Sequence, residues 1–186
     1  MNKYTISLYI FIAIAILIFH SCENEIAKIQ AITKKSEMPL LTSYDVNVLY
    51  SDSGLIKTQL NSPEVNDYAE ETDKPSYTEF PNGLNIMFYD TNMVVKASLT
   101  AKWGQYQKQK KMWEFKNNVV LVNIENDTLT TEHLFVDTEN EKMTSDVYVC
   151  IKKKDGSKMQ GKKGFESNLT FTKYQFKGVS YDGWNY

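Results

Sequence analysis

The sequence contains no arginine, so all 21 of its basic side chains are lysines. Arginine is the residue whose planar guanidinium binds phosphates and guanine edges with two hydrogen bonds at once. The formal net charge is only −2, so the chain is not strongly basic either. Nucleic acid is therefore not expected as a partner.

Histidine and cysteine are almost as scarce, with two residues of each. His133 is the only histidine beyond the first 22 residues, so neither a zinc-binding histidine pair nor a Ser-His-Asp triad can be assembled there. Cys150 lies in an alternating apolar stretch, where it is expected to act as a small hydrophobic residue. No glycine-rich phosphate loop is present. We therefore predict no enzyme activity, no catalytic residue, no metal and no cofactor.

The N-terminus carries an uncharged apolar run from Tyr4 to Phe19, preceded by Lys3 and followed by Ser21 and Cys22. A membrane-spanning helix needs about 20 apolar residues, and this run of 16 is short for that. The Ser-Cys pair resembles a bacterial lipoprotein cleavage box, which predicts lipidation at Cys22. An uncleaved membrane helix remains the alternative. In both cases residues 1–22 are predicted to tether the chain to a membrane, outside the cytoplasm.

The remaining chain is long enough for one domain with its own core. Residues 23–39 space their isoleucines as in a short helix or a linker, which Pro39 ends. From residue 40, alternating Thr, Val, Ile, Tyr and Phe are interrupted by turn sequences such as "FPNG" and "KKDGSK", which predicts an all-β domain over 40–180. Residues 181–186 are predicted to form a C-terminal tail.

A repeat of 30 residues supports the β assignment. "LTAKWGQY" begins at Leu99, "LTTEHLFV" at Leu129 and "MQGKKGFE" at Met159, each after a turn. A strand pair cannot bury its apolar face alone, so we expect successive pairs to stack into two sheets around a shared interior, as in a jelly roll or a β-solenoid.

Alternation along the strands predicts which side chains face that interior. Large aromatic residues such as Trp103 and Trp113 would give it broad apolar surfaces. The predicted interior residues are Leu84, Ile86, Phe88, Ala101, Trp103, Trp113, Phe115, Val119, Leu121, Phe135, Val147, Val149, Phe165, Leu169 and Phe171. Ordinary sandwich core is the alternative role for each of them.

The succession "FPNGLNIMFYD", "ASLTAKWGQY", "NNVVLVN", "DTLTTEHLFVD" and "MTSDVYVCIKKKDGSKMQGKKGFESNLTFTKY" resembles the LptC family of the lipopolysaccharide export machinery, within the OstA-like β-jellyrolls. The resemblance runs from about Tyr44 to Gly178 and rests on strand and turn residues. It implies a twisted, open β-jellyroll of two antiparallel sheets with an apolar groove, anchored to the inner membrane and facing the periplasm.

The resemblance also implies a route for lipopolysaccharide. An inner-membrane ABC transporter would deliver the lipid, the apolar groove would hold its lipid A acyl chains, and an LptA-like periplasmic bridge protein would receive it. The open edge near "LLTSYDVNVLYS" would face the transporter, and that near "NLTFTKYQFKG" the bridge. Two alternatives stay open: a β-rich lipoprotein that binds protein or glycan, and an adaptor without a lipid conduit.

Overall fold

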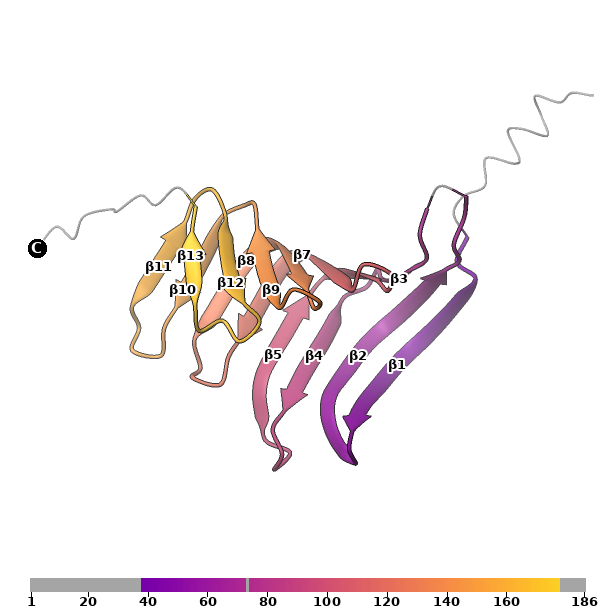
Figure 1. Ribbon diagram of the computed structural model, residues 1–186, viewed down its shortest axis with the longest axis horizontal. Helices are drawn as coiled ribbons and strands as arrows, with labels where there is room; N and C mark the ends of the chain where they lie inside the picture. The colour runs from indigo at the N-terminus through magenta and orange to yellow at the C-terminus, as the bar shows by residue number, and fades with distance from the viewer. Residues whose placement is uncertain (1–37, 73, 178–186) are drawn as a thin grey trace, which may run out of the picture. The chain divides into compact units, whose positions relative to one another are not determined.

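The computed structural model describes residues 38–72 and 74–177 (Figure 1). The chain divides into two units after Met38, and every strand belongs to the second unit. The predictions for residues 1–22, for lipidation at Cys22, for the linker before Met38 and for the tail 181–186 lie outside the described residues. The described part is all-β, as predicted, and is consistent with a β-jellyroll.

Within the described residues, thirteen strands form one antiparallel sheet, and most strands that follow each other in the sequence are paired in it. Their bounds are β1 Leu41–Asp52, β2 Leu55–Tyr68, β3 Tyr77–Phe80, β4 Leu84–Tyr89, β5 Val95–Ala101, β6 Trp103–Gln107, β7 Met112–Val122, β8 Thr128–Asp137, β9 Lys142–Ser145, β10 Val149–Lys152, β11 Lys158–Gly161, β12 Phe165–Asn168 and β13 Tyr174–Phe176.

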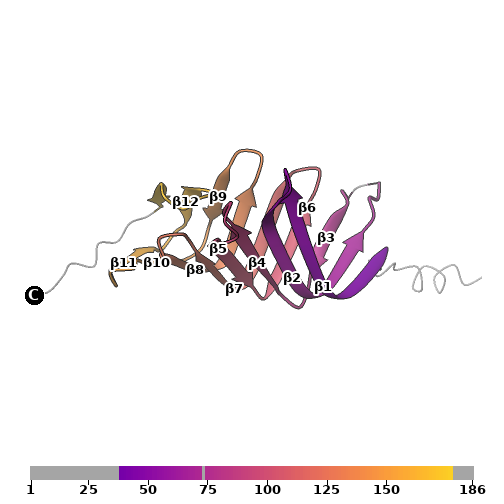
Figure 2. The ribbon, with the colours of Figure 1, turned by 90° about the horizontal axis from the view of Figure 1, so that it is seen from below.

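The sheet is folded lengthwise into two walls, which Figure 2 shows from below. We call the strands β4, β5, β10 and β11 the first wall, and β3, β6, β9, β12 and β13 the second wall. The long strands β1, β2, β7 and β8 belong to both. For example, Val119–Val122 of β7 pairs with β8 in the first wall, and Met112–Lys116 of β7 pairs with β8 in the second. The two predicted sheets are therefore one continuous sheet, because four strands cross from one wall to the other.

The fold line between the walls, which we call the seam, is polar and hydrogen-bonded. Asn117 and Asn118 of β7 have φ values of 63° and 55°, and this left-handed pair turns the strand from one wall into the other. The amide of Lys102 donates to the carbonyl of Asn117 at 3.0 Å. The buried Ser62 hydroxyl lies 2.8 Å from the carbonyl of Gly83. The seam thus supplies partners for backbone groups that the bend removes from the ladder.

Register places one aliphatic side chain per strand in a row across the first wall. The row is Val48, Leu60, Ile86, Leu99, Leu121, Leu129, Ile151 and Met159. Three of its members, Leu99, Leu129 and Met159, are the starts of the 30-residue repeat. In each 30-residue repeat the chain leaves this row, passes through the second wall and comes back to the row in the first wall.

Candidate functional site

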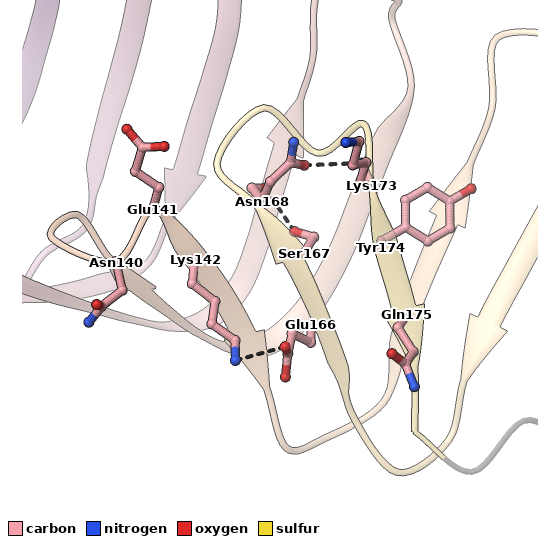
Figure 3. Close-up of a pocket in the computed structure, with 9 residues that line it drawn as sticks. All are labelled: Asn140, Glu141, Lys142, Glu166, Ser167, Asn168, Lys173, Tyr174 and Gln175. Carbon is pink, nitrogen blue, oxygen red and sulfur yellow. Dashed lines mark hydrogen bonds and ion pairs between the residues drawn. The ribbon is translucent and has the colours of Figure 1, made fainter.

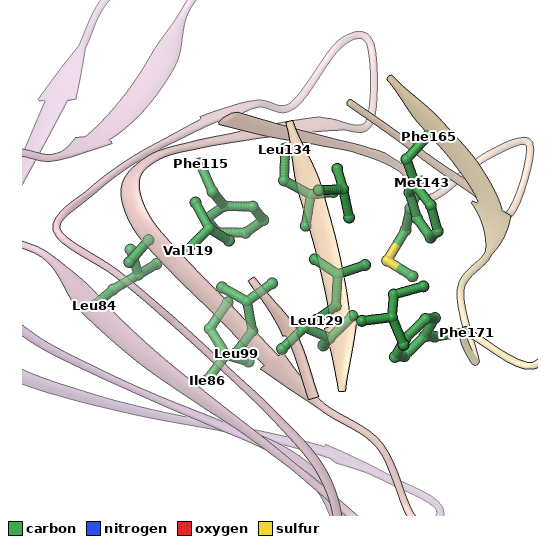
Figure 4. Packing of buried hydrophobic residues seen from close by; sticks show 14 of the residues in the cluster. Leu84, Ile86, Leu99, Phe115, Val119, Leu129, Leu134, Met143, Phe165 and Phe171 are labelled. Atoms are coloured by element: carbon green, nitrogen blue, oxygen red, sulfur yellow. The ribbon is translucent and has the colours of Figure 1, made fainter. Parts of the chain in front are cut away.

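The space between the walls is apolar and tightly packed (Figure 4). Its buried side chains are Phe80, Leu84, Ile86, Leu99, Ala101, Phe115, Val119, Leu121, Leu129, Leu134, Met143, Val149, Ile151, Phe165 and Phe171. Both walls contribute: Leu84 of the first wall lies so close to Gly104 of the second that a Cβ on Gly104 would sit 2.8 Å from the Leu84 side chain. Glycine at position 104 therefore lets the two walls meet next to the seam.

Exposure of the interior rises toward the N-terminal end. In the aliphatic row, Leu129 is fully buried, Ile86 is 5% exposed and Val48 of β1 is 50% exposed. Leu60 of β2 and Phe88 of β4 are only partly buried. The apolar interior is thus accessible beside β1 and β2 and closed further along the chain.

Aromatic rings close the C-terminal end. Phe165 packs against Phe171, Tyr174 and Phe176 with ring centroids 5.8–6.1 Å apart. Tyr174 lies in the second wall, and its hydroxyl is 3.5 Å from the sulfur of Met159 in the first wall. Phe176 lies against Gly161, where a Cβ would overlap its ring. The rings therefore connect the walls at this end.

The structure brings eleven of the fifteen predicted interior residues together. Nine belong to the buried cluster: Leu84, Ile86, Ala101, Phe115, Val119, Leu121, Val149, Phe165 and Phe171. Phe88 and Trp113 are partly buried and pack against it. The Trp113 ring stacks on Tyr106 and Phe115 at centroid distances of 4.6 and 5.5 Å. Contact of these residues with a lipid stays a prediction.

The predicted face is wrong for Trp103 and Phe135. The Trp103 indole donates to Glu79 at 2.9 Å and lies under the Lys116 ammonium, and Phe135 packs on His133, all on the opposite face. The reason is the seam. Ala101 and Gly104 both face the interior with two residues between them, so alternation counted through the bend assigns β6 to the wrong face. In β8, two residues likewise lie between Thr131 and Leu134, and both of these side chains are buried in the interior.

Val147 and Leu169 are also not part of the cluster. Val147 lies in the bend between β9 and β10, and Leu169 lies in the turn between β12 and β13, where it is exposed. Alternation does not apply in either place, because neither residue is in a strand.

The prediction omitted several interior residues. They are Leu60, Val65, Phe80, Leu99, Leu129, Leu134, Val136, Met143, Ile151, Met159, Tyr174 and Phe176. The 30-residue repeat already marked Leu99, Leu129 and Met159 as equivalent positions. For Leu134 and Val136 the sequence held no comparable signal, because their face depends on the shift at the seam.

A charged network covers the outer face of the second wall. Glu114 Oε1 lies 2.7 Å from Lys116 Nζ and 2.8 Å from His133 Nε2. Burial raises the pKa of the Glu114 carboxyl, but the hydrogen bonds from Lys116 and His133 outweigh burial, so its pKa is below the ordinary value of 4.5. The Glu114 carboxylate is thus bonded to two neighbouring side chains of the same wall, so we interpret the network as structural.

Two surface cavities are lined mainly by polar and charged residues. One, of about 430 Å³, is lined by Asn140, Glu141, Lys142, Glu166, Ser167, Asn168, Lys173, Tyr174 and Gln175 (Figure 3). The other, of about 530 Å³, is lined by Glu125, Asp127, Lys153, Lys154 and Asp155. In the first cavity Lys142 forms an ion pair with Glu166 at 2.7 Å. The backbone amide of Lys173 donates a hydrogen bond to the side-chain oxygen of Asn168. Their polar groups thus bind one another.

Within residues 38–72 and 74–177, no group of three or more His, Cys, Asp or Glu side chains is placed to hold a metal ion. The same described residues contain no helix of the length and apolarity needed to cross a membrane.

Comparison with protein families identifies a match over most of the chain. The model of a family described as "Lipopolysaccharide-assembly, LptC-related" matches residues 7–178. A search of curated proteins finds no match. The matched residues include every strand described above.

Proposed function

Because the chain belongs to the LptC family, whose members take part in lipopolysaccharide transport in the bacterial envelope, we propose that its apolar interior carries lipid A acyl chains. The family is one of transport and binding components, not of enzymes. In this proposal the twisted β-jellyroll is anchored to the inner membrane by residues 1–22 and faces the periplasm. It receives the lipid from ABC transporter subunits and passes it to an LptA-like bridge protein.

The observation that carries the proposal is the graded exposure of the interior. Transfer of an acyl chain from water into an apolar environment is favourable by about 0.8 kcal/mol per methylene. Exposed Val48 and partly buried Leu60 and Phe88 offer apolar surface at the N-terminal end. An acyl chain that enters there would continue along the same row of aliphatic side chains by parting the walls, and the seam would act as the hinge.

Free strand edges support the two docking steps. In the described part of the chain, β1 pairs only with β2, β11 only with β10 and β13 only with β12. Natural proteins usually protect such edges with Lys, Pro or bulges. The twelve residues of β1 contain no Lys and no Pro, and the register of β1 with β2 shifts only at its end, between Tyr50 and Ser51. Leu41, Val48 and Leu49 are exposed along the strand. This edge is suited to strand addition by a partner.

Charge differs between the two ends. Residues 41–90 contain nine acidic residues and two lysines, whereas residues 147–177 contain eight lysines and two acidic residues. Lys152 in β10 and Lys158 in β11 are both exposed and lie directly opposite each other. Their like charges repel, which destabilises the pairing of these two strands when no acidic partner is bound. The opposite charges support different partners at the two ends, with an acidic partner edge at the β11 and β13 end.

A second candidate is an adaptor that positions partners and carries no lipid. The observation in its favour is the filled interior from β4 onward, where the side chains of the protein itself occupy the space. An adaptor needs the free strand edges at both ends but not the exposed apolar row.

Substitution of single residues of β2 and β5 separates the two functions. Leu60→Asp places a charge in the accessible interior, and Thr100→Asp places the same charge on the exposed outer face of the first wall, away from the free edges. The carrier function predicts that L60D loses lipopolysaccharide co-purified from cells while T100D retains it. Equal retention by both variants, folded and at equal abundance, would contradict the carrier function and favour the adaptor.

A further inference from the structure

Two turns at the outer rim of the first wall expose large apolar side chains strongly, whereas in the described turns of the second wall the most exposed large apolar residue is Leu169, at 37%. The first-wall turns join β1 to β2, β4 to β5, β7 to β8 and β10 to β11, and they lie along the lower side of Figure 1. Met93, Val94 and Ile124 in these turns are 47%, 60% and 68% exposed. The β2–β3, β6–β7 and β8–β9 turns of the second wall instead carry Glu70, Glu71, Lys108, Lys110, Lys111, Glu139 and Glu141.

Three of the first-wall turns share one backbone conformation. In each, the first amide donates to the carbonyl four residues later, and the fourth amide donates back to the first carbonyl; the turns begin at Asp90, Asn123 and Lys153. Side chains reinforce two of them, since Asp90 Oδ1 accepts the amides of Asn92 and Val94, and Asn123 Oδ1 accepts those of Glu125 and Asp127. The conformation is therefore held by backbone and Asx contacts and does not require apolar side chains.

Met93 is at odds with this turn. The fourth residue of each turn has a left-handed φ, which is 63° at Asn126, 89° at Gly156 and 61° at Met93. Asn and Gly adopt this conformation readily, whereas methionine does so against its preference. The turn gains nothing from an exposed methionine at this position. Lys111, the fourth residue of the β6–β7 turn, also has a left-handed φ, of 49°, so Met93 is distinguished by its exposed apolar side chain, which points to a role for that side chain.

A lipid surface suits these turns better than a protein pocket. Met93 and Val94 are exposed in the β4–β5 turn and Ile124 in the β7–β8 turn, so the apolar side chains extend along one rim, which suits a plane. Lys153 and Lys154 in the last turn are offset by acidic residues of the same rim, among them Asp127, which pairs with Lys153, so apolar contact and not charge carries the interaction. The domain is also within reach of a bilayer if residues 1–22 are anchored, because the 19 residues between Phe19 and Pro39 extend to at most about 65 Å.

We propose that the rim formed by the β4–β5, β7–β8 and β10–β11 turns rests on the surface of a phospholipid bilayer, with Met93, Val94 and Ile124 inserted among the headgroups. This contact rests on the proposed anchor but not on lipopolysaccharide binding. It would hold the first wall against the membrane and leave the charged turns of the second wall in water.

The test uses the full-length chain in vesicles of phosphatidylethanolamine and phosphatidylglycerol that contain no lipopolysaccharide. A fluorescent amino acid is placed at Ile124, at Val94 or, as the matched control, at exposed Lys110 in the β6–β7 turn. Quenching by lipids brominated near the glycerol backbone should be several-fold stronger at 124 and 94 than at 110. Met93→Asn should weaken quenching at 94 while it raises the melting temperature, a combination that a purely structural methionine would not produce.

Three outcomes would overturn the proposal. Equally weak quenching at all three positions means that the rim is in water. Equally strong quenching at 110 means that the contact is not specific to the first wall. Shielding of 94 and 124 from aqueous iodide in native membranes but not in vesicles means that a protein covers the rim. In native membranes, which contain lipopolysaccharide, crosslinking of this lipid to a photo-crosslinking amino acid at position 113 reports separately on the carrier function.

Discussion

The hydroxyl of Tyr174 in β13 lies 3.5 Å from the sulfur of Met159 in β11, so a residue of the second wall touches the first wall at the C-terminal end of the interior. No backbone ladder joins β13 to β11 in the described sheet, and side chains make this connection. The interior is thus closed at one end by a contact that can separate without loss of strand pairing.

The aromatic closure can be tested by two substitutions at one position. Tyr174→Ala removes ring contacts with Phe165, Phe171 and Phe176, and should lower the free energy of unfolding by about 2–4 kcal/mol. Tyr174→Phe removes only the weak bond to sulfur and should cost less than about 1 kcal/mol. Urea unfolding of both variants measures this. Equal stability losses would show that the hydroxyl, not the ring, connects the walls.

The seam depends on Ser62, whose buried hydroxyl lies 2.8 Å from the Gly83 carbonyl and 2.7 Å from the Glu64 carbonyl. Ser62→Ala leaves these acceptors with one partner fewer, and the free energy of unfolding should fall by about 1–3 kcal/mol. Ser51→Ala, on the exposed part of β1, is the control and should change little. A neutral effect of S62A in the same urea titration would contradict the structural role given to the seam.

The lowered pKa of Glu114 predicts that this residue stabilises the fold to an extent that depends on pH. Its pKa in the folded protein is lowered, so the carboxylate stabilises the fold above its ordinary pKa of 4.5, and this contribution is lost as the pH falls below that value. The stability difference between the wild type and Glu114→Gln should therefore shrink between about pH 7 and about pH 3.

The matched control repeats that comparison in a Lys116→Met background, where one of the hydrogen bonds that lower the pKa is absent. The pH dependence should then be weaker. If E114Q shows the same pH dependence with and without Lys116, the ion pair is not its source.

The basic C-terminal end predicts docking that depends on salt. Lys152→Glu with Lys158→Glu reverses the charge of the cross-strand pair and should reduce crosslinking of β11 to the proposed LptA-like bridge protein. Raised ionic strength should weaken the wild-type crosslink, because exposed charges are screened beyond about 10 Å at 0.1 M salt. Unchanged crosslinking in the variant would place the docking site elsewhere.

Alternation within single strands predicted most of the interior correctly. In β4, Leu84, Ile86 and Phe88 share the apolar face as expected, and in β7 Phe115, Val119 and Leu121 do so as well. In β7 the face is preserved through the bend because three residues separate Phe115 from Val119. The 30-residue repeat agrees with the register, since Leu99, Leu129 and Met159 lie in one row, but the strand pairs form one continuous sheet and not two.

Prediction failed where the chain bends. Two residues separate Ala101 from Gly104, so the face changes and Trp103 lies outside. The number of residues at a bend depends on how the two walls meet. The sequence "AKWG" contains no signal that indicates this number. The closure by Tyr174 and Phe176 was also not predicted, since it joins strands of different walls that do not pair.

Trp113 and Trp103 provide the most direct test of the central claim, that the interior carries lipid. Both are tryptophans of neighbouring strands in the second wall; Trp113 packs against the interior cluster, and Trp103 stacks under Lys116 on the opposite face. A photo-crosslinking amino acid is placed at each position in separate strains, and irradiated cells are probed for lipopolysaccharide adducts. The account predicts adducts from position 113 and none from 103. Adducts from neither position, or from both equally, in folded and expressed protein would contradict it.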